Sequence, residues 1–177
     1  SEFPPSIELG CRTVVVPPWL TWMRNLPDLP FLVYGEQFAR RCRTLFADDR
    51  PDFVYQRYSV LNYSGAFLAD RLGCPFVLEY NGSEVWVARH WSTPLFFEGL
   101  ADRIEQANLR RADLIVVVSK ALRDEVVARG VSPERVLVNP NGVDPARYHL
   151  GIDGGPIRRR LMLEGKLVIG FIGTFGP

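Results

Sequence analysis

The run LIVVV at residues 114–118 places the strongest constraint on the fold of this chain. All of its residues are apolar, so a strand formed by them has no polar face to turn toward water. Strands of this kind are typical of the centre of a parallel sheet, where both faces are covered. Other apolar runs occupy residues 53–55, 75–80 and 136–138, and turn formers or charged residues bound them. We therefore expect a parallel sheet.

Segments with helical spacing separate these runs. They cover residues 33–46, 64–72, 93–111 and 120–130. Gly73 is placed to end the second segment, Thr93 to begin the third and Ser119 to begin the fourth. A further β-branched run, residues 13–16, ends at a pair of prolines. Strands that alternate with helices predict an α/β fold with a doubly wound, Rossmann-like parallel sheet.

The composition is that of an ordinary globular protein. Of the 177 residues, 47% are hydrophobic and 23% are charged, which is enough for one domain with a sizeable core. The net charge of +1 gives no indication of nucleic-acid binding. No apolar run reaches the roughly 18 residues of a membrane-spanning helix, and the first residues do not resemble a signal peptide. Three scattered cysteines predict reduced thiols in a cytoplasmic protein, without a zinc site or any other metal site.

Polar residues follow the predicted strands at their carboxyl ends. Ligands of parallel α/β sheets bind beyond these ends, so the residues are candidates for a binding site. One sheet edge is expected to carry a residue from each strand end, namely Arg57, Asn81, Ser119 and Asn141. Gly82 and Gly142 follow asparagines, and Asn-Gly pairs favour turns with positive φ. Each end alone is also compatible with a simple turn, but four ends on one rim favour a site.

The chain changes character after Asp144. Residues 150–156 are rich in glycine and lack apolar periodicity, which is typical of a linker. A helix is expected over residues 157–164, then a strand over residues 167–172 that leads into a glycine-rich loop of the kind that holds phosphate. The predicted organisation is a Rossmann-like domain at 1–148, incomplete at its start, a linker at 149–156 and the start of a second Rossmann-like domain at 157–177. We therefore interpret the chain as a fragment.

Several segments, taken in order, resemble the family 4 glycosyltransferases. They are YQRYS, LEYNGSE, ADLIVVVS, ERVLVNPNGVD and VIGFIGTFGP, and the resemblance covers roughly residues 50–177. Members of that family are retaining enzymes with two Rossmann-like domains, the GT-B fold, and they work without a metal. The resemblance implies that the first domain binds a glycan, lipid or small-molecule acceptor and that the second holds a nucleotide-sugar donor. It implies no cofactor, and it implies that this fragment alone is inactive.

The loop after residues 75–80 resembles the acceptor-side loop of that family. Several members carry a histidine there, but this loop reads EYNGSE and has none. Asn81 and Glu84 are the predicted catalytic residues, because they are the best placed to contact sugar hydroxyls. The predicted acceptor-binding residues are Arg57, Glu79, Gly82 and His90. Trp86 and Trp91 flank His90 and are expected either to pack as a lid or to stack on a sugar.

The resemblance also implies residues at the cleft between the domains and at the donor. The predicted cleft residues are Ser119, Asn141, Gly142 and Asp144. Gly142 is expected to let the backbone reverse where the chain leaves the first domain, and Asn141 and Asp144 to bond neighbouring backbone amides. Gly173 and Thr174 form the predicted donor-phosphate loop. The commoner family version has an arginine where Thr174 stands, which leaves the basic partner of the phosphate unassigned.

Other functions remain open. A non-hydrolysing sugar-nucleotide epimerase of the same fold would be favoured by pairs of histidine and glutamate, and the chain has only His90 and His149. A non-catalytic Rossmann-like domain such as a receiver needs an aspartate at a central strand end, where Ser119 stands. The aromatic loop at residues 17–23 and the arginine clusters are compatible with peripheral contact at the inner face of the cytoplasmic membrane, or with a packed loop and solvated helix faces.

Overall fold

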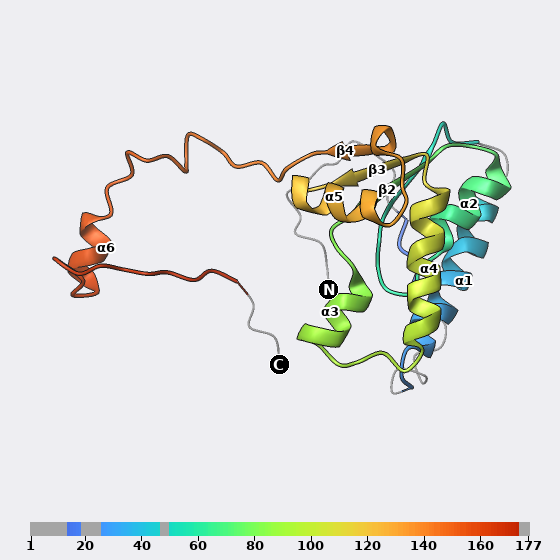
Figure 1. The fold of residues 1–177 in the computed structure, drawn as a ribbon, viewed down its shortest axis with the longest axis horizontal. Coiled ribbons are helices and arrows are strands. Elements are labelled where there is room, and N and C mark those ends of the chain that lie inside the picture. The colour runs from blue at the N-terminus through green and yellow to red at the C-terminus, as the bar shows by residue number, and fades with distance from the viewer. Residues whose placement is uncertain (1–13, 19–25, 47–49, 174–177) are drawn as a thin grey trace.

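A four-stranded parallel sheet forms the centre of the protein in the computed structural model, which describes residues 14–18, 26–46 and 50–173 (Figure 1). The strands are β1 (Val54–Arg57), β2 (Phe76–Tyr80), β3 (Leu114–Val117) and β4 (Val136–Val138). They lie side by side in the order of the chain, with Val77 opposite Leu114 and Ile115 opposite Val136. The predicted α/β class with a parallel sheet is confirmed.

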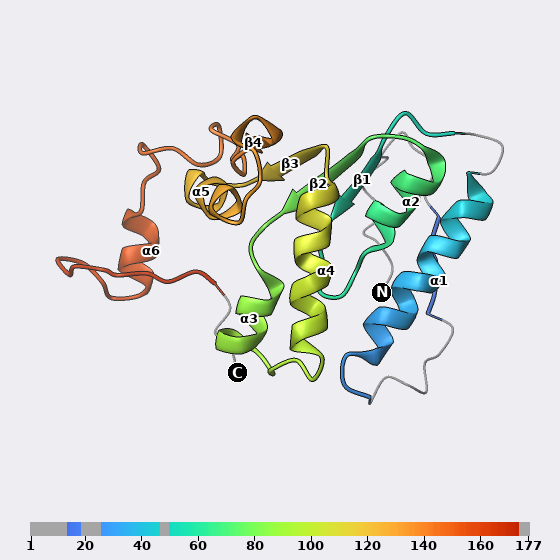
Figure 2. The same ribbon diagram turned by 45° about the vertical axis from the view of Figure 1, so that its right-hand side comes forward.

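Helices connect and cover the strands. They are α1 (Leu29–Leu45), α2 (Ser64–Leu72), α3 (Glu84–Trp91), α4 (Glu98–Arg111), α5 (Lys120–Ala128) and α6 (Gly155–Arg160), with a 3-10 helix, η2 (Pro133–Arg135), before β4. Because each strand lies next to the preceding one, right-handed crossovers are expected to place α2, α4 and α5 on one face of the sheet. Figures 1 and 2 show α4 next to β2, which it contacts, and α1 beside α2, with which it packs. No helix in the described ranges is long and apolar enough to span a bilayer.

The hydrophobic core lies on one face of the sheet. Alternate residues of the central strands are fully buried, namely Phe76, Leu78, Tyr80, Ile115 and Val117. On the opposite face Leu114 and Val116 are half-buried, and Tyr55 and Leu137 are exposed. The LIVVV run predicted burial on both faces, whereas the part of the chain that the structure describes covers one face completely.

Two predicted helix ends are confirmed. Gly73 ends α2 in the left-handed conformation, at φ 62°, and its N–H donates to the carbonyl of Ala69. Ser119 begins α5, because its Oγ accepts the N–H of Leu122 at 3.2 Å. Both ends depend on contacts within about one helical turn, so the local sequence is sufficient to predict them.

The predicted start of a helix at Thr93 is wrong. Residues 93–95 are irregular and α4 begins at Glu98. The N–H of Phe97 donates to the carboxylate of Asp28 at 2.8 Å, so a residue before α1 serves the start of α4. This bond joins segments far apart in the sequence, which explains why the local cap signal at Thr93 is misleading. The preceding helix, α3, was not delimited from the sequence.

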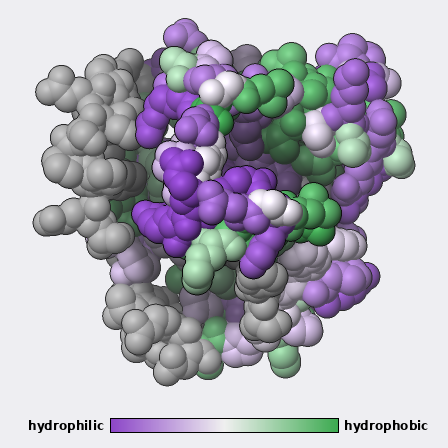
Figure 3. Space-filling view, turned by 90° about the vertical axis from the view of Figure 1, so that its left-hand side faces the viewer, coloured by the Kyte–Doolittle hydropathy of each residue, from purple (hydrophilic) through white to green (hydrophobic). Residues whose placement is uncertain are grey.

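The chain beyond β4 also differs from its prediction. α6 ends at Arg160, before the predicted end of that helix, and residues 167–172 form no strand. A strand needs a neighbour for its backbone hydrogen bonds, and no described strand pairs with this segment. Figure 1 shows α6 apart from the sheet, and Figure 3 shows hydrophilic side chains gathered on the face seen from that side. The boundaries between domain, linker and second domain stay a prediction.

The remaining predictions concern the first part of the chain. Residues 14–18 form no strand, although the Tyr34 hydroxyl on α1 donates to the carbonyl of Val16 at 3.1 Å. Cys42 and Cys74 are buried free thiols, as predicted. Cys11 and most of the aromatic loop at residues 17–23 lie outside the described residues.

Candidate functional site

The carboxyl ends of the four strands meet at one edge of the sheet, which we call the carboxyl edge. Arg57 is the last residue of β1, Asn81 directly follows β2, and Ser119 and Asn141 follow β3 and β4 within three residues. All four strands are parallel neighbours, so the prediction that these residues lie along one edge is confirmed.

The loop after β2 turns the chain directly from the sheet into α3. Gly82 has φ 128°, a backbone conformation that glycine adopts readily, as the Asn-Gly pair predicted. The Ser83 hydroxyl accepts the N–H of Trp86 at 3.1 Å and so caps α3. The short loop leaves Asn81 exposed, with Glu84 at the first position of the helix.

Glu79 holds a small polar cluster at the end of β2. Its carboxylate accepts the Tyr55 hydroxyl at 2.7 Å and the Asn81 amide at 2.9 Å, and the Arg57 Nε lies 3.7 Å away. The hydrogen bond from Tyr55, then the one from Asn81, keeps the pKa of Glu79 below its usual value. Glu79 is therefore ionised at neutral pH and orients the side chain of Asn81.

Two cavities share α3 as part of their walls. The larger, the α3–α5 cavity of about 550 Å³, is lined by Asn81, Gly82, Ser83, Trp86, Val87, Leu122, Glu125 and Arg129. Its walls come from the loop after β2, from α3, from α5 and from the residue that ends α5. The loop at the end of β2 and the helices that follow β2 and β3 thus build it, and binding sites of parallel sheets are expected beyond such strand ends.

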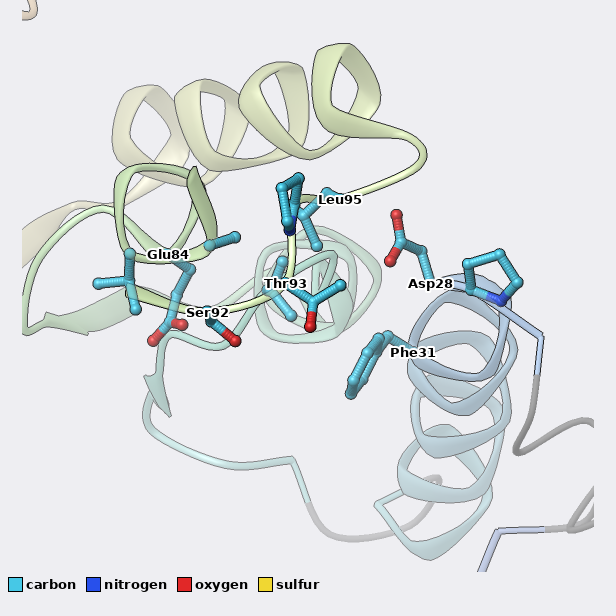
Figure 4. Close-up of a pocket in the computed structure, with 11 residues that line it drawn as sticks. Asp28, Phe31, Glu84, Ser92, Thr93 and Leu95 are labelled. Atoms are coloured by element: carbon cyan, nitrogen blue, oxygen red, sulfur yellow. The ribbon is translucent and has the colours of Figure 1, made fainter. Parts of the chain in front are cut away.

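The smaller cavity, of about 340 Å³, lies on the α1 side of α3, and we call it the α1–α3 cavity. Its polar lining consists of Asp28, Glu84, Ser92 and Thr93, and its apolar lining includes Phe31, Val60, Val87 and Leu95. Figure 4 shows Glu84 and Ser92 on one side of this cavity and Asp28 and Phe31 across from them. Asn81 and Glu84, both predicted as catalytic residues, therefore line different cavities, and Val87 lines both.

Glu84, at the start of α3, is a charged residue whose carboxylate lacks hydrogen-bond partners in the described part of the chain. Its side chain is half-buried, yet its carboxylate accepts no hydrogen bond from the residues that the structure describes. Burial, and then the negative charge of Glu105, raises the pKa of Glu84, while Arg57 acts in the opposite direction. A half-buried carboxylate of raised pKa beside a cavity can accept a proton or orient a hydroxyl.

A buried cluster behind the loop was missed by the sequence reasoning. Glu105 of α4 is completely buried and contacts Tyr80, Arg129 and the backbone of Glu84. A signal was present, because Glu105 shares one helical face with the buried residues Ala101, Asn108 and Leu109. A carboxylate on the apolar face of a helix needs an internal partner, which the sequence alone does not identify.

The predicted acceptor residue His90 lines neither cavity. Its ring stacks on that of Trp86, with centroids 4.4 Å apart, and its Nδ1 lies 2.8 Å from the carbonyl of Trp86. Trp86, His90 and Trp91 are all exposed. Trp86 lines the α3–α5 cavity, so of these three rings it is the one placed to stack on a ligand there.

The predicted reverse turn at NPNGVD is wrong. Residues 139–144 are irregular and exposed, and Gly142 does not adopt positive φ. Nothing lies within 4 Å of a Cβ built at Gly142, so neither backbone conformation nor packing requires a glycine there. Asp144 does bond a neighbouring amide, that of Ala146, at 2.9 Å. Gly173 lies in an exposed bend, and Thr174 lies outside the described residues.

Most of the chain matches a known family. A family model described as a glycosyl transferase 4-like domain matches residues 2–142. The chain belongs to this family. The glycosyl transferase 4-like domain therefore accounts for the sheet, the loop after β2 and both cavities, and the resemblance found in the sequence is confirmed.

Several known proteins are similar to this glycosyl transferase 4-like chain. A GDP-mannose-dependent alpha-mannosyltransferase of Mycobacterium tuberculosis (strain CDC 1551 / Oshkosh) is 29% identical over 155 residues, which cover 87% of this chain and 40% of that protein. The chain thus spans less than half the length of that relative. Two solved structures match parts of the chain. UDP-N-acetylglucosamine 2-epimerase from Rickettsia bellii has TM-score 0.46, 14% identity and coverage of 66% and 28% of the two chains. Anabaena HepE in complex with UDP has TM-score 0.44, 20% identity and coverage of 78% and 35%.

Proposed function

We propose that the complete protein containing this chain transfers a sugar from a nucleotide-sugar donor to an acceptor hydroxyl with retention, and that this chain supplies the acceptor side. The observation that carries the proposal is Glu84. This carboxylate stands at the start of α3, just beyond the end of β2 in a glycosyl transferase 4-like domain; it lines a cavity and accepts no hydrogen bond from any described residue. Polar groups left with free capacity at the carboxyl edge are expected where a ligand binds.

The two cavities suit two parts of the reaction. In the α1–α3 cavity, ionised Glu84 orients the acceptor hydroxyl, while Ser92 and Thr93 bind other hydroxyls of the acceptor. In the α3–α5 cavity, Asn81 contacts the sugar that is transferred and Trp86 offers a ring face. The diphosphate leaving group needs positive charge or backbone N–H groups, which we assign to residues of the second domain.

The name of the mycobacterial relative suggests GDP-mannose as the first donor to test. We further propose that no metal takes part. The strand ends carry no Asp-x-Asp sequence of the kind that holds a divalent ion on a diphosphate in other glycosyltransferases. Positioning and fixed charges of the protein then have to supply the stabilisation of the transition state.

The test uses the complete protein with GDP-mannose and a panel of other nucleotide-sugars, each offered with simple glycosides and with a lipid extract as acceptors. We expect release of the nucleoside diphosphate together with a glycosylated product whose anomeric configuration, read by NMR, equals that of the donor. An epimerised nucleotide-sugar formed without acceptor would establish the epimerase alternative. Inversion at the anomeric carbon, or activity lost to a chelator and restored by manganese, would contradict the proposed mechanism.

A further inference from the structure

Glu105 is a charged residue in the interior of the protein, with no exposed surface. Its carboxylate accepts three hydrogen bonds from three different elements. The Tyr80 hydroxyl at the end of β2 lies 3.2 Å from Oε1, the backbone N–H of Glu84 at the start of α3 lies 3.1 Å from Oε2, and Nη1 of Arg129, which ends α5, lies 2.5 Å from Oε1. One side chain therefore joins the elements around both cavities.

Stability alone is a weak explanation for such a group. Burying a carboxylate and a guanidinium removes both from water, and replacing buried ion pairs by apolar residues is often neutral or stabilising. An apolar replacement, however, cannot accept a hydrogen bond and so cannot fix the orientation of a particular backbone N–H. The first N–H groups of a helix have no partner within the helix, and at α3 Ser83 takes that of Trp86 while Glu105 takes that of Glu84.

We propose that Glu105 is a positioning residue for the transfer reaction: it fixes the first turn of α3 and thereby the direction of the Glu84 side chain. The inference rests on the proposed function of Glu84. Because the first turn of α3 also follows directly on Asn81 and Gly82, the same contact sets the wall of the α3–α5 cavity.

Arg129 connects Glu105 with the second wall of that cavity. Its side chain reaches the buried carboxylate and also lies 3.7 Å from Glu125. Both Arg129 and Glu125 line the α3–α5 cavity. The distance between α3 and the end of α5 is thus held by one buried carboxylate, through an N–H on one side and a guanidinium on the other.

Glu105 also acts on Glu84 through its charge. The groups that face the Glu84 region are Glu105 from α4, Arg57 and Tyr58 from the end of β1, and Asp28 from the opposite side of the α1–α3 cavity. The negative charge of Glu105 contributes to the raised pKa of Glu84, second to burial. Removing that charge lowers the pKa of Glu84, so that Glu84 stays ionised to lower pH.

The first experiment compares Glu105→Gln with wild type in the complete protein. Glutamine has nearly the same shape but no charge, and its single oxygen cannot accept from both the Glu84 N–H and Arg129. We expect kcat to fall about 10- to 100-fold, the scale of effect of misplacing a catalytic group, with the KM for the nucleotide-sugar close to that of wild type. The acid limb of the pH profile shifts to lower pH, which a purely structural residue does not cause.

The Glu105→Asp variant distinguishes the effect of the negative charge from the effect of side-chain length. It keeps the negative charge but is one methylene too short to hold the Glu84 N–H. We expect a reduced kcat with the acid limb at its wild-type position, and this variant decides the question of positioning if Glu105→Gln does not fold. Asp113→Asn is the matched control, because Asp113 bonds the backbone N–H of Phe76 at the opposite edge of the sheet. It is expected to lower stability and leave kcat unchanged.

Three results would overturn the inference: an unchanged kcat in both Glu105 variants, an acid limb that stays in place in a folded Glu105→Gln, or an equal loss of kcat in the control. Hydrogen exchange of the Glu84 amide gives a readout that needs no activity. We expect faster exchange in Glu105→Gln than in wild type. If the wild-type protein transfers no sugar, the proposed function fails, and an unchanged exchange rate would then reject the positioning contact separately.

Discussion

The two edges of the sheet treat their charged groups differently. At the amino edge, where the strands begin, the Asp113 carboxylate accepts the N–H of Phe76 at 2.7 Å and pairs with Arg111 at 3.0 Å. Arg135 there donates to three backbone carbonyls around the end of α4. At the carboxyl edge the carboxylate of Glu84 faces a cavity without a hydrogen bond from a described residue. The charged groups at the amino edge are therefore paired within the protein. At the carboxyl edge, where we propose that substrate binds, the carboxylate of Glu84 has no such partner among the described residues.

The pKa values of the two carboxyl groups express the same difference. The N–H of Phe76, and then the guanidinium of Arg111, holds the pKa of Asp113 below its usual value. Burial and the charge of Glu105 raise the pKa of Glu84. Ionised Asp113 therefore stabilises the folded protein, whereas ionised Glu84 is tolerated at some cost in stability. A residue kept despite such a cost is a candidate for function.

The largest effect is expected from Glu84→Ala in the complete protein. Loss of a charged hydrogen bond to substrate costs about 1.5–3 kcal/mol, which lowers kcat/KM about 10- to 100-fold. The melting temperature should not fall, because the carboxylate contributes no hydrogen bond to the fold. Glu98→Ala is the control, since Glu98 pairs with Arg89 and lines neither cavity. Retained turnover in Glu84→Ala, or a loss of activity that only follows the melting temperature, would show that Glu84 has no role in the reaction and that the two edges do not differ in function.

At the amino edge, Asp113→Ala is expected to act on stability alone. The lost hydrogen bond and ion pair are partly exposed, so the free energy of unfolding should fall by about 1 kcal/mol at neutral pH. Because the pKa of Asp113 is lowered in the folded state, its contribution is present above the unfolded value near 3.8 and is lost as the pH falls through the folded value. Denaturant unfolding of both proteins from pH 7 to pH 3 measures this. A difference that grows toward low pH would have the wrong sign.

Asn81→Ala should have a smaller effect on activity than Glu84→Ala. Its amide is neutral and already donates to Glu79, so about 0.5–1.5 kcal/mol of interaction with a bound sugar is at stake, or roughly a two- to tenfold loss of turnover. The same kinetic and thermal measurements apply. A loss as large as that of Glu84→Ala would instead assign the principal role to the α3–α5 cavity.

The smallest effect is expected from Tyr58→Phe at the carboxyl edge. The Tyr58 hydroxyl is buried and has no hydrogen-bond partner within the described ranges. Removing an unsatisfied hydroxyl relieves part of its desolvation penalty, so the free energy of unfolding should stay equal or rise by up to about 1 kcal/mol. Chemical denaturation measures the change. A clear loss of stability would mean that the hydroxyl has a partner, such as a bound water.

Local chemistry explains which parts of the fold could be predicted. The apolar runs that become the four strands and the caps at Gly73 and Ser119 are signals within short stretches of sequence, and all of them were predicted. The start of α4 was missed because Asp28, before α1, bonds the N–H of Phe97. The candidate site follows the same division. The sequence placed polar residues at the strand ends, but the cavities and the partners of Glu105 bring distant segments together, so neither could be predicted.

A substitution of Val87 would change both cavities together. This one side chain lines the α3–α5 cavity and the α1–α3 cavity at once. A bulkier residue there narrows both spaces, and a smaller one widens both. For the two ligands that we propose for these cavities, selectivity is therefore not independently adjustable at this position. A substitution at residue 87 that adapts one cavity requires a compensating change in the lining of the other.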